Sequence, residues 1–194
     1  MRGHWIVAMF VFLAMAGCAV ASGEGVAKEE EALDALDAFS KSARLDPGEV
    51  VLGMVGFYGQ PQPVQWLILT GKPGGPLRES VVARGRVLAE RKFSPLPGQD
   101  LPHLPLVRET LKLSSARAFR IAETRARSRR TAFDSAHFQL RVRDEGAEPV
   151  WMLSLLNSAQ VSVGIVYVSA HSGEILRETW THPPRPDDAK VSAR

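Results

Sequence analysis

The sequence predicts an α+β fold of two tandem units, in each of which a helix packs on one face of an antiparallel sheet. Two amphipathic stretches with helical spacing, near residues 27–43 and 114–130, each precede short runs of alternating apolar and polar residues. Residues 94–105 hold four prolines in twelve positions and separate the two series. The predicted organisation is a signal (1–23), a first unit (24–93), a linker (94–111), a second unit (112–180) and a disordered tail (181–194).

Residues 1–23 have the features of an export signal. Arg2 precedes an unbroken apolar run from Trp5 to Ala21, and small residues close it. At 17 residues the run is short for a bilayer core of about 30 Å, and small-residue endings favour cleavage. We therefore expect an exported protein, either periplasmic or anchored as a lipoprotein on the periplasmic side of a membrane.

Cys18 is the sole cysteine, so the exported part of the chain has no intramolecular disulfide. Residues 15–18 (Met-Ala-Gly-Cys) resemble the bacterial lipobox, whose cysteine becomes the lipidated first residue, although Met15 stands where that pattern prefers leucine. Residues 19–21 (Ala-Val-Ala) before Ser22 form a competing cleavage site that would discard Cys18. Lipidation at Cys18 and cleavage before Ser22 both stay open, and an uncleaved anchor is the third alternative.

The first unit is predicted to contain a helix at 27–43 and four strands. Apolar residues recur every three or four positions in the helix, and Asp-Pro-Gly at 46–48 ends it. Strands are expected at 49–58, at 64–70, and twice within 77–93, with a turn at Arg84-Gly85. Gly53 and Gly56 indicate a bulge or a close backbone approach in the first strand.

The second unit is predicted to repeat this order. Ser114 or Ser115 can cap its helix, and Phe119, Ala122 and Ala126 make the inner stripe. Four strands are expected between residues 133 and 180, separated by turns at 144–147, 157–160 and 170–173.

Two short patterns recur between the halves. Pro63-Val64-Gln65-Trp66 is echoed by Pro149-Val150-Trp151, and the Gly85 turn is echoed at Gly173, with separations of 86 and 88 positions. We interpret these as a diverged tandem duplication. Since Trp66 and Trp151 occupy equivalent positions, we expect both in the core rather than in a ligand site.

The second half resembles a PepSY-type domain. The resemblance lies in the amphipathic helix, the alternating strand, Pro-Val-Trp at 149–151 and the turn segment 170–176 (Ala-His-Ser-Gly-Glu-Ile-Leu). It covers residues 112–180 and reaches 27–93 only through the repeat. It implies an exported or membrane-attached envelope protein that binds or restrains a peptidase, and tandem copies resemble the beta-lactamase-inhibitor-like architecture. It implies no catalytic residue.

A cluster of arginines is the candidate partner surface. The outer face of the second helix holds Arg117, Arg120 and Arg127, and the strand that follows adds Arg141 and Arg143. These side chains either form a solvated face, paired in part with the acidic face of the first helix, or bind an acidic protein or an anionic lipid surface.

The composition argues against nucleic-acid binding, because 24 basic and 21 acidic residues leave a net charge of only +3. His103, His137, His171 and His182 lack the spacing of a metal site, and no nucleophile elbow surrounds Ser135. We therefore expect no catalytic, metal-binding or cofactor-binding residue, and a non-enzymatic protein that binds an envelope protein or peptide. The alternatives are a structural or assembly lipoprotein without a dedicated ligand and, last, an unrecognised hydrolase.

Overall fold

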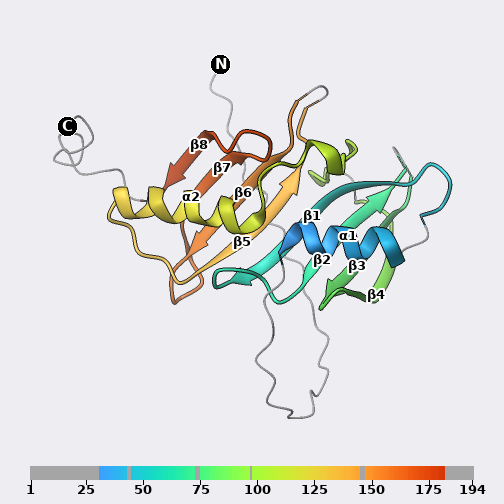
Figure 1. The fold of residues 1–194 in the computed structure, drawn as a ribbon, viewed down its shortest axis with the longest axis horizontal. Coiled ribbons are helices and arrows are strands. Elements are labelled where there is room, and N and C mark those ends of the chain that lie inside the picture. Colours follow the sequence, from blue (N-terminus) through green and yellow to red (C-terminus); the bar gives the residue numbers. More distant parts are fainter. Residues whose placement is uncertain (1–30, 43–44, 73–74, 97, 145–146, 182–194) are drawn as a thin grey trace, which may run out of the picture.

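The computed structural model describes residues 31–42, 45–72, 75–96, 98–144 and 147–181. In them, eight strands form one antiparallel sheet in the order β4-β3-β2-β1-β5-β6-β7-β8, and two α-helices lie on the same face of it (Figure 1). The helices are α1 (Ala32–Ser42) and α2 (Ser115–Ser128), with a short 3-10 helix, η1 (Arg108–Thr110), before α2. The strands are β1 (Val50–Gly59), β2 (Trp66–Gly71), β3 (Leu77–Ala83), β4 (Arg86–Phe93), β5 (Ser135–Arg141), β6 (Val150–Leu156), β7 (Ser162–Ser169) and β8 (Ile175–Trp180).

The predicted α+β fold of two helix-plus-sheet units is wrong. The molecule is dominated by a single sheet, because β1 pairs with β2 along one edge and with β5 along the other. The β1–β5 register runs from Gly53 opposite Arg141 to Gly59 opposite Ala136. This pairing satisfies backbone groups that would be open edges if each half formed its own sheet. The eight individual strands are nevertheless found where alternation predicts them. The predicted turns at 84–85, 157–160 and 170–173 are also present.

Glycines in β1 allow close packing at this junction, as expected. The register of β1 shifts between Val51 and Gly53 against β2, and between Gly56 and Gly59 against β5. A Cβ atom on Gly56 would lie 2.5 Å from Cγ of Pro63 and 2.8 Å from the ring of Trp66. A Cβ on Gly53 would lie 2.9 Å from the carbonyl oxygen of Leu140. The bulge and the close approach are therefore both confirmed.

Aromatic residues fill the centre of the core between the sheet and the helices. Trp66 and Trp151 are fully buried, which confirms their predicted place. Phe138 lies beside both, with ring centroids 5.7 Å from Trp66 and 6.4 Å from Trp151. Trp151 also donates its indole N–H to the carbonyl of Leu113 at 3.0 Å, so its polar atom is satisfied inside the core.

Small residues let α2 approach the sheet. Ala118, Ala122 and Ala126 are buried at spacings of four, facing β6 and β7. The predicted cap is confirmed, since Ser114 accepts a hydrogen bond from the backbone N–H of Arg117. The next residue, Ser115, links distant parts of the chain: its hydroxyl accepts from the N–H of Ala32 at 3.1 Å and donates to Gln62 at 2.5 Å.

The described part of the proline-rich connector, residues 94–107, has no helix or strand, as expected. It packs on the sheet, where the N–H of Leu106 donates to the carbonyl of Val51 at 2.7 Å. Arg141, the last residue of β5, forms an ion pair with Asp100 of the connector at 2.8 Å and thereby lowers the pKa of the Asp100 carboxyl. The connector is therefore part of the folded body. The signal, residues 27–30 of the predicted first helix and the tail from residue 182 lie outside the described residues.

Candidate functional site

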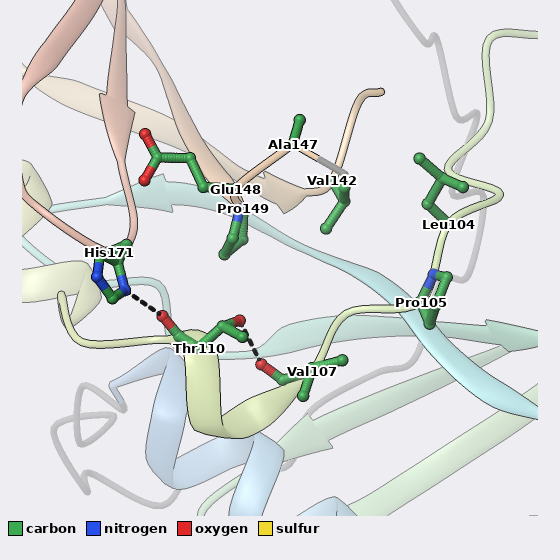
Figure 2. Close-up of a pocket in the computed structure, with 9 residues that line it drawn as sticks. All are labelled: Leu104, Pro105, Val107, Thr110, Val142, Ala147, Glu148, Pro149 and His171. Atoms are coloured by element: carbon green, nitrogen blue, oxygen red, sulfur yellow. Dashed lines mark hydrogen bonds between the residues drawn. The ribbon is translucent and has the colours of Figure 1, made fainter. Parts of the chain in front are cut away.

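Three segments that are far apart in sequence line a groove of about 550 Å³ where β5 and β7 end and β6 begins. They are the connector with η1, the loop between β5 and β6, and the turn between β7 and β8 (Figure 2). The lining residues are Leu104, Pro105, Val107, Thr110, Val142, Ala147, Glu148, Pro149 and His171. Most of these side chains are apolar, so the groove offers a surface for another apolar group.

Glu148 and His171 are the titratable residues among the nine lining residues, and they lie toward the same side of the view in Figure 2. Glu148 accepts a hydrogen bond from the hydroxyl of Ser169 at 2.8 Å. The same hydroxyl oxygen accepts from the backbone N–H groups of His171 at 3.2 Å and Ser172 at 2.9 Å. The carboxylate is thus held in place by the turn that carries the histidine.

The exposed imidazole of His171 is tied to the opposite wall. Its Nδ1 lies 3.4 Å from the carbonyl oxygen of Thr110, whose own hydroxyl donates to the carbonyl of Val107 at 2.7 Å (Figure 2). These contacts orient the two polar residues without forming a nucleophile–base pair. Among the described residues no three His, Cys, Asp or Glu side chains are grouped so as to hold a metal ion. The groove is therefore equipped to bind an apolar group beside a polar one.

The five arginines of the predicted partner surface fall into two places. Arg117, Arg120 and Arg127 are exposed on the outer side of α2. Arg141 lies on β5 next to the core residue Leu140, so it points to the face away from the helices, where it is paired with Asp100. Arg143 is exposed beyond the end of β5. The structure brings the three helix residues together and leaves the other two apart from them.

Sequence reasoning missed the partner shared by Arg125 of α2 and Arg129, the residue that follows the helix. Arg125 binds Glu178 of β8 at 2.5 and 2.8 Å, and Arg129 reaches the same carboxylate. The hydrogen bond from Arg125, supported by Arg129, lowers the pKa of Glu178 to about 2. Glu178 stands opposite the core residue Val166 in the sheet. Because an acid on an apolar face needs a cation, the position of Glu178 in the strand pattern could have indicated an ion pair.

The acidic helix α1 also has a specific partner. Asp37 receives two hydrogen bonds from Arg108 of η1, at 2.8 and 3.2 Å, which lower the pKa of the carboxyl. The other charged residues of α1 are Asp34 and Lys41, and Glu31 immediately precedes the helix. Asp37 is thus paired with the connector rather than with an outer arginine of α2.

His137 lies on the sheet face away from the helices. Its ring stands edge-on to Phe57 and Tyr58, with centroids 5.1 and 4.5 Å away. Its Nε2 is buried and has no hydrogen-bond partner among the described residues. Burial lowers the pKa of His137. An imidazole whose neutral form is favoured by burial against two aromatic rings is a packing residue.

Cys18 and Ser22 lie outside the described residues, so the structure does not bear on lipidation or cleavage. In the described part of the chain, no helix is both long and apolar enough to span a membrane.

The fold and the groove define a class of protein: an open antiparallel sheet with helices on one face and an apolar groove at one end. No family model matches the sequence, and no curated protein matches it either. Among solved structures, the chain is similar to a "putative lipoprotein" of Clostridium difficile 630, with a TM-score of 0.52 and 11% identity. The match covers 81% of this chain and 99% of that one. It establishes a shared fold.

Proposed function

We propose that this chain is an envelope lipoprotein, exported by residues 1–23, held to a membrane through a lipidated Cys18, and serving as a structural or assembly component. The observation that carries the proposal is the apolar run from Trp5 to Ala21 with a single cysteine after Met-Ala-Gly. The fold shared with a protein described as a putative lipoprotein supports it.

The proposal assigns no reaction to the protein. The two titratable side chains of the groove, Glu148 and His171, are engaged with the hydroxyl of Ser169 and the carbonyl of Thr110. They fix the loops of the groove, and neither is positioned to activate a nucleophile.

Two substitutions separate lipidation from ordinary cleavage. Cys18→Ala removes the acylated residue, whereas Ala21→Arg blocks the cleavage site before Ser22 and leaves the lipobox-like segment unchanged. Cells are labelled with a radioactive fatty acid and then fractionated. We expect label and membrane association to be lost in Cys18→Ala and retained in Ala21→Arg. An unlabelled wild-type protein, found in the soluble periplasm, would refute the proposal.

A second candidate function, peptide binding, is favoured by the groove. Its apolar walls beside Glu148 and His171 suit an extended segment with an apolar side chain, and the PepSY resemblance implies that such a segment would belong to a peptidase. The test is photocrosslinking in the native envelope with Val107→Asp. Val64→Asp is the matched control, since Val107 and Val64 are 48% and 50% exposed and Val64 does not line the groove. Loss of a crosslinked partner in Val107→Asp alone supports peptide binding; identical partners in both variants contradict it.

A further inference from the structure

Positive charge in this protein is concentrated on one helix. Between Lys112 and Thr131 the sequence has seven basic residues and one acid, a net charge of +6. Since the whole chain carries +3, the remaining residues carry −3. Glu178 neutralises part of this charge by binding Arg125 and Arg129. Among the described ion pairs of Glu178, none involves Arg117, Arg120 or Arg127 of α2.

The exposed part of this charge forms a stripe. Arg117, Arg120, Thr124 and Arg127 are all exposed and follow one another at spacings of three, four and three, so they share the outer side of α2. Arg127 has Glu123 one turn earlier at 2.9 Å, whereas the described structure gives Arg117 and Arg120 no acidic partner. We call these four residues the arginine stripe.

A shallow pocket of about 450 Å³ adjoins the stripe. Its lining combines guanidinium and hydroxyl groups with the apolar side chains of Ile121 on α2 and Ile175 on β8. The full lining is Arg120, Ile121, Thr124, Arg125, Ser128 and Ile175. Guanidinium groups bind phosphate, and Arg120 is the guanidinium of this pocket that suits it, because Arg125 is bound to Glu178. The hydroxyls of Thr124 and Ser128 donate to the carbonyls of Arg120 and Arg125, and the isoleucines provide an apolar floor.

The chain enters the fold beside this stripe. The N–H of Ala32, at the start of α1, donates to the hydroxyl of Ser115, two residues before Arg117. Fourteen positions separate Cys18 from Ala32, so a lipid on Cys18 would hold this point within about 50 Å of the membrane. This segment is therefore long enough for an anchored molecule to place its basic helix against the headgroups.

We infer that the arginine stripe and the adjoining pocket form a docking surface for anionic phospholipid headgroups, which acts together with the Cys18 anchor. This inference rests on the proposed function for the anchor, but the surface itself acts through charge. The lipid on Cys18 would fix the chain to the bilayer, and the basic surface would hold the folded body against the headgroups. Each arginine near an anionic surface adds about fivefold to the partition coefficient, so three arginines contribute roughly a hundredfold.

The test uses the full chain with Cys18→Ala, purified as its host exports it, so that no lipid anchor contributes. Binding is measured by flotation with phosphatidylcholine vesicles with or without 30 mol per cent phosphatidylglycerol, in low salt. We expect flotation only with phosphatidylglycerol, and its loss in 0.5 M salt, because salt screens exposed charges. Absence of flotation with phosphatidylglycerol vesicles would overturn the inference.

Two triple variants locate the surface. Arg117→Gln with Arg120→Gln and Arg127→Gln should lower the partition coefficient roughly a hundredfold. The control, Lys72→Gln with Arg84→Gln and Arg86→Gln, removes the same charge from exposed positions after β2, on the β3–β4 turn and at the first residue of β4. It should retain binding within a few-fold. Equal losses in both triples, or no loss in the first, would overturn the inference.

Folding and anchoring are checked separately. Thermal unfolding of each triple variant confirms that the exposed substitutions leave the fold intact, and a single Arg120→Gln variant with about a fivefold loss provides a second test. If Cys18 proves not to be lipidated, the proposed function fails while the vesicle result stands. If Cys18 is lipidated but the Cys18→Ala protein does not float with phosphatidylglycerol vesicles, the inference of a docking surface is refuted and the proposed function stands.

Discussion

Trp66 of β2 and Trp151 of β6 lie edge to face in the middle of one core, with ring centroids 6.1 Å apart. The two residues come from opposite halves of the chain, and both are fully buried. The aromatic contact, together with the β1–β5 pairing, makes the two halves a single packed body. The stability of either half should therefore depend on the other.

Substitution in the first half should loosen the second. Trp66→Leu should lower the free energy of unfolding by about 3 kcal/mol, because it leaves a cavity against Trp151 and Phe138. Hydrogen exchange of the β6 and β7 amides should accelerate in this variant. Unchanged protection in β6 and β7, with loss confined to β2 and β3, would show that the halves unfold independently.

The ion pair of Glu178 should give the protein an acid-sensitive component. Because the folded-state pKa of about 2 lies below the ordinary value of 4.5, the carboxylate contributes stability that is fully present above pH 4.5 and lost as the pH falls toward 2. Glu178→Gln should cost about 2 kcal/mol at pH 7 and much less near pH 2, as measured by urea unfolding. Glu174→Gln, an exposed acid on the same hairpin, serves as the control. Equal costs at both pH values would contradict this prediction.

His137 should make the stability of the protein depend on pH below about 6.5. Burial lowers its pKa from the ordinary 6.5, so its neutral form contributes stability that is present above pH 6.5 and is lost as the pH falls through its folded-state value. His137→Phe should reduce the loss of stability below pH 6.5. His171→Phe, at an exposed position, should not. An NMR titration in which His137 protonates at or above pH 6.5 would rule this out.

Gly56 should tolerate no side chain. An added Cβ would lie 2.5 Å from Pro63 and 2.8 Å from Trp66, so Gly56→Ala should destabilise the protein by about 1–3 kcal/mol through displacement of the core indole. Gly75→Ala, where the nearest atom would be 3.4 Å away, is the matched control. Similar melting temperatures for the two variants would count against the packing described for β1.

Local patterns in the sequence predict the strands well because a strand with one buried face must alternate. Phe138 and Leu140 face the core as that alternation requires, and Ser114 caps α2 as its side-chain chemistry suggests. The pairing of β1 with β5 could not be predicted in this way, since it joins residues more than 75 positions apart that share no local pattern. The joining of the two halves into a single sheet could therefore be recognised only from the structure.

The candidate sites also differ in whether local sequence patterns predict them. The arginines on α2 can be placed on one helix face from their spacing alone. The groove could not be predicted, because Val107, Val142 and His171 meet there only through the packing of the connector on the sheet. The partner of Arg125 was hidden for the same reason, since Glu178 lies 53 positions away.

We propose that this folded body is tethered to a membrane through Cys18. The most direct measurement is the intact mass and N-terminal peptide of the protein isolated from its native envelope. We predict a chain that begins at Cys18 and carries the added mass of a diacylglyceryl group on that residue. An unmodified chain that begins at Ser22 would contradict the claim.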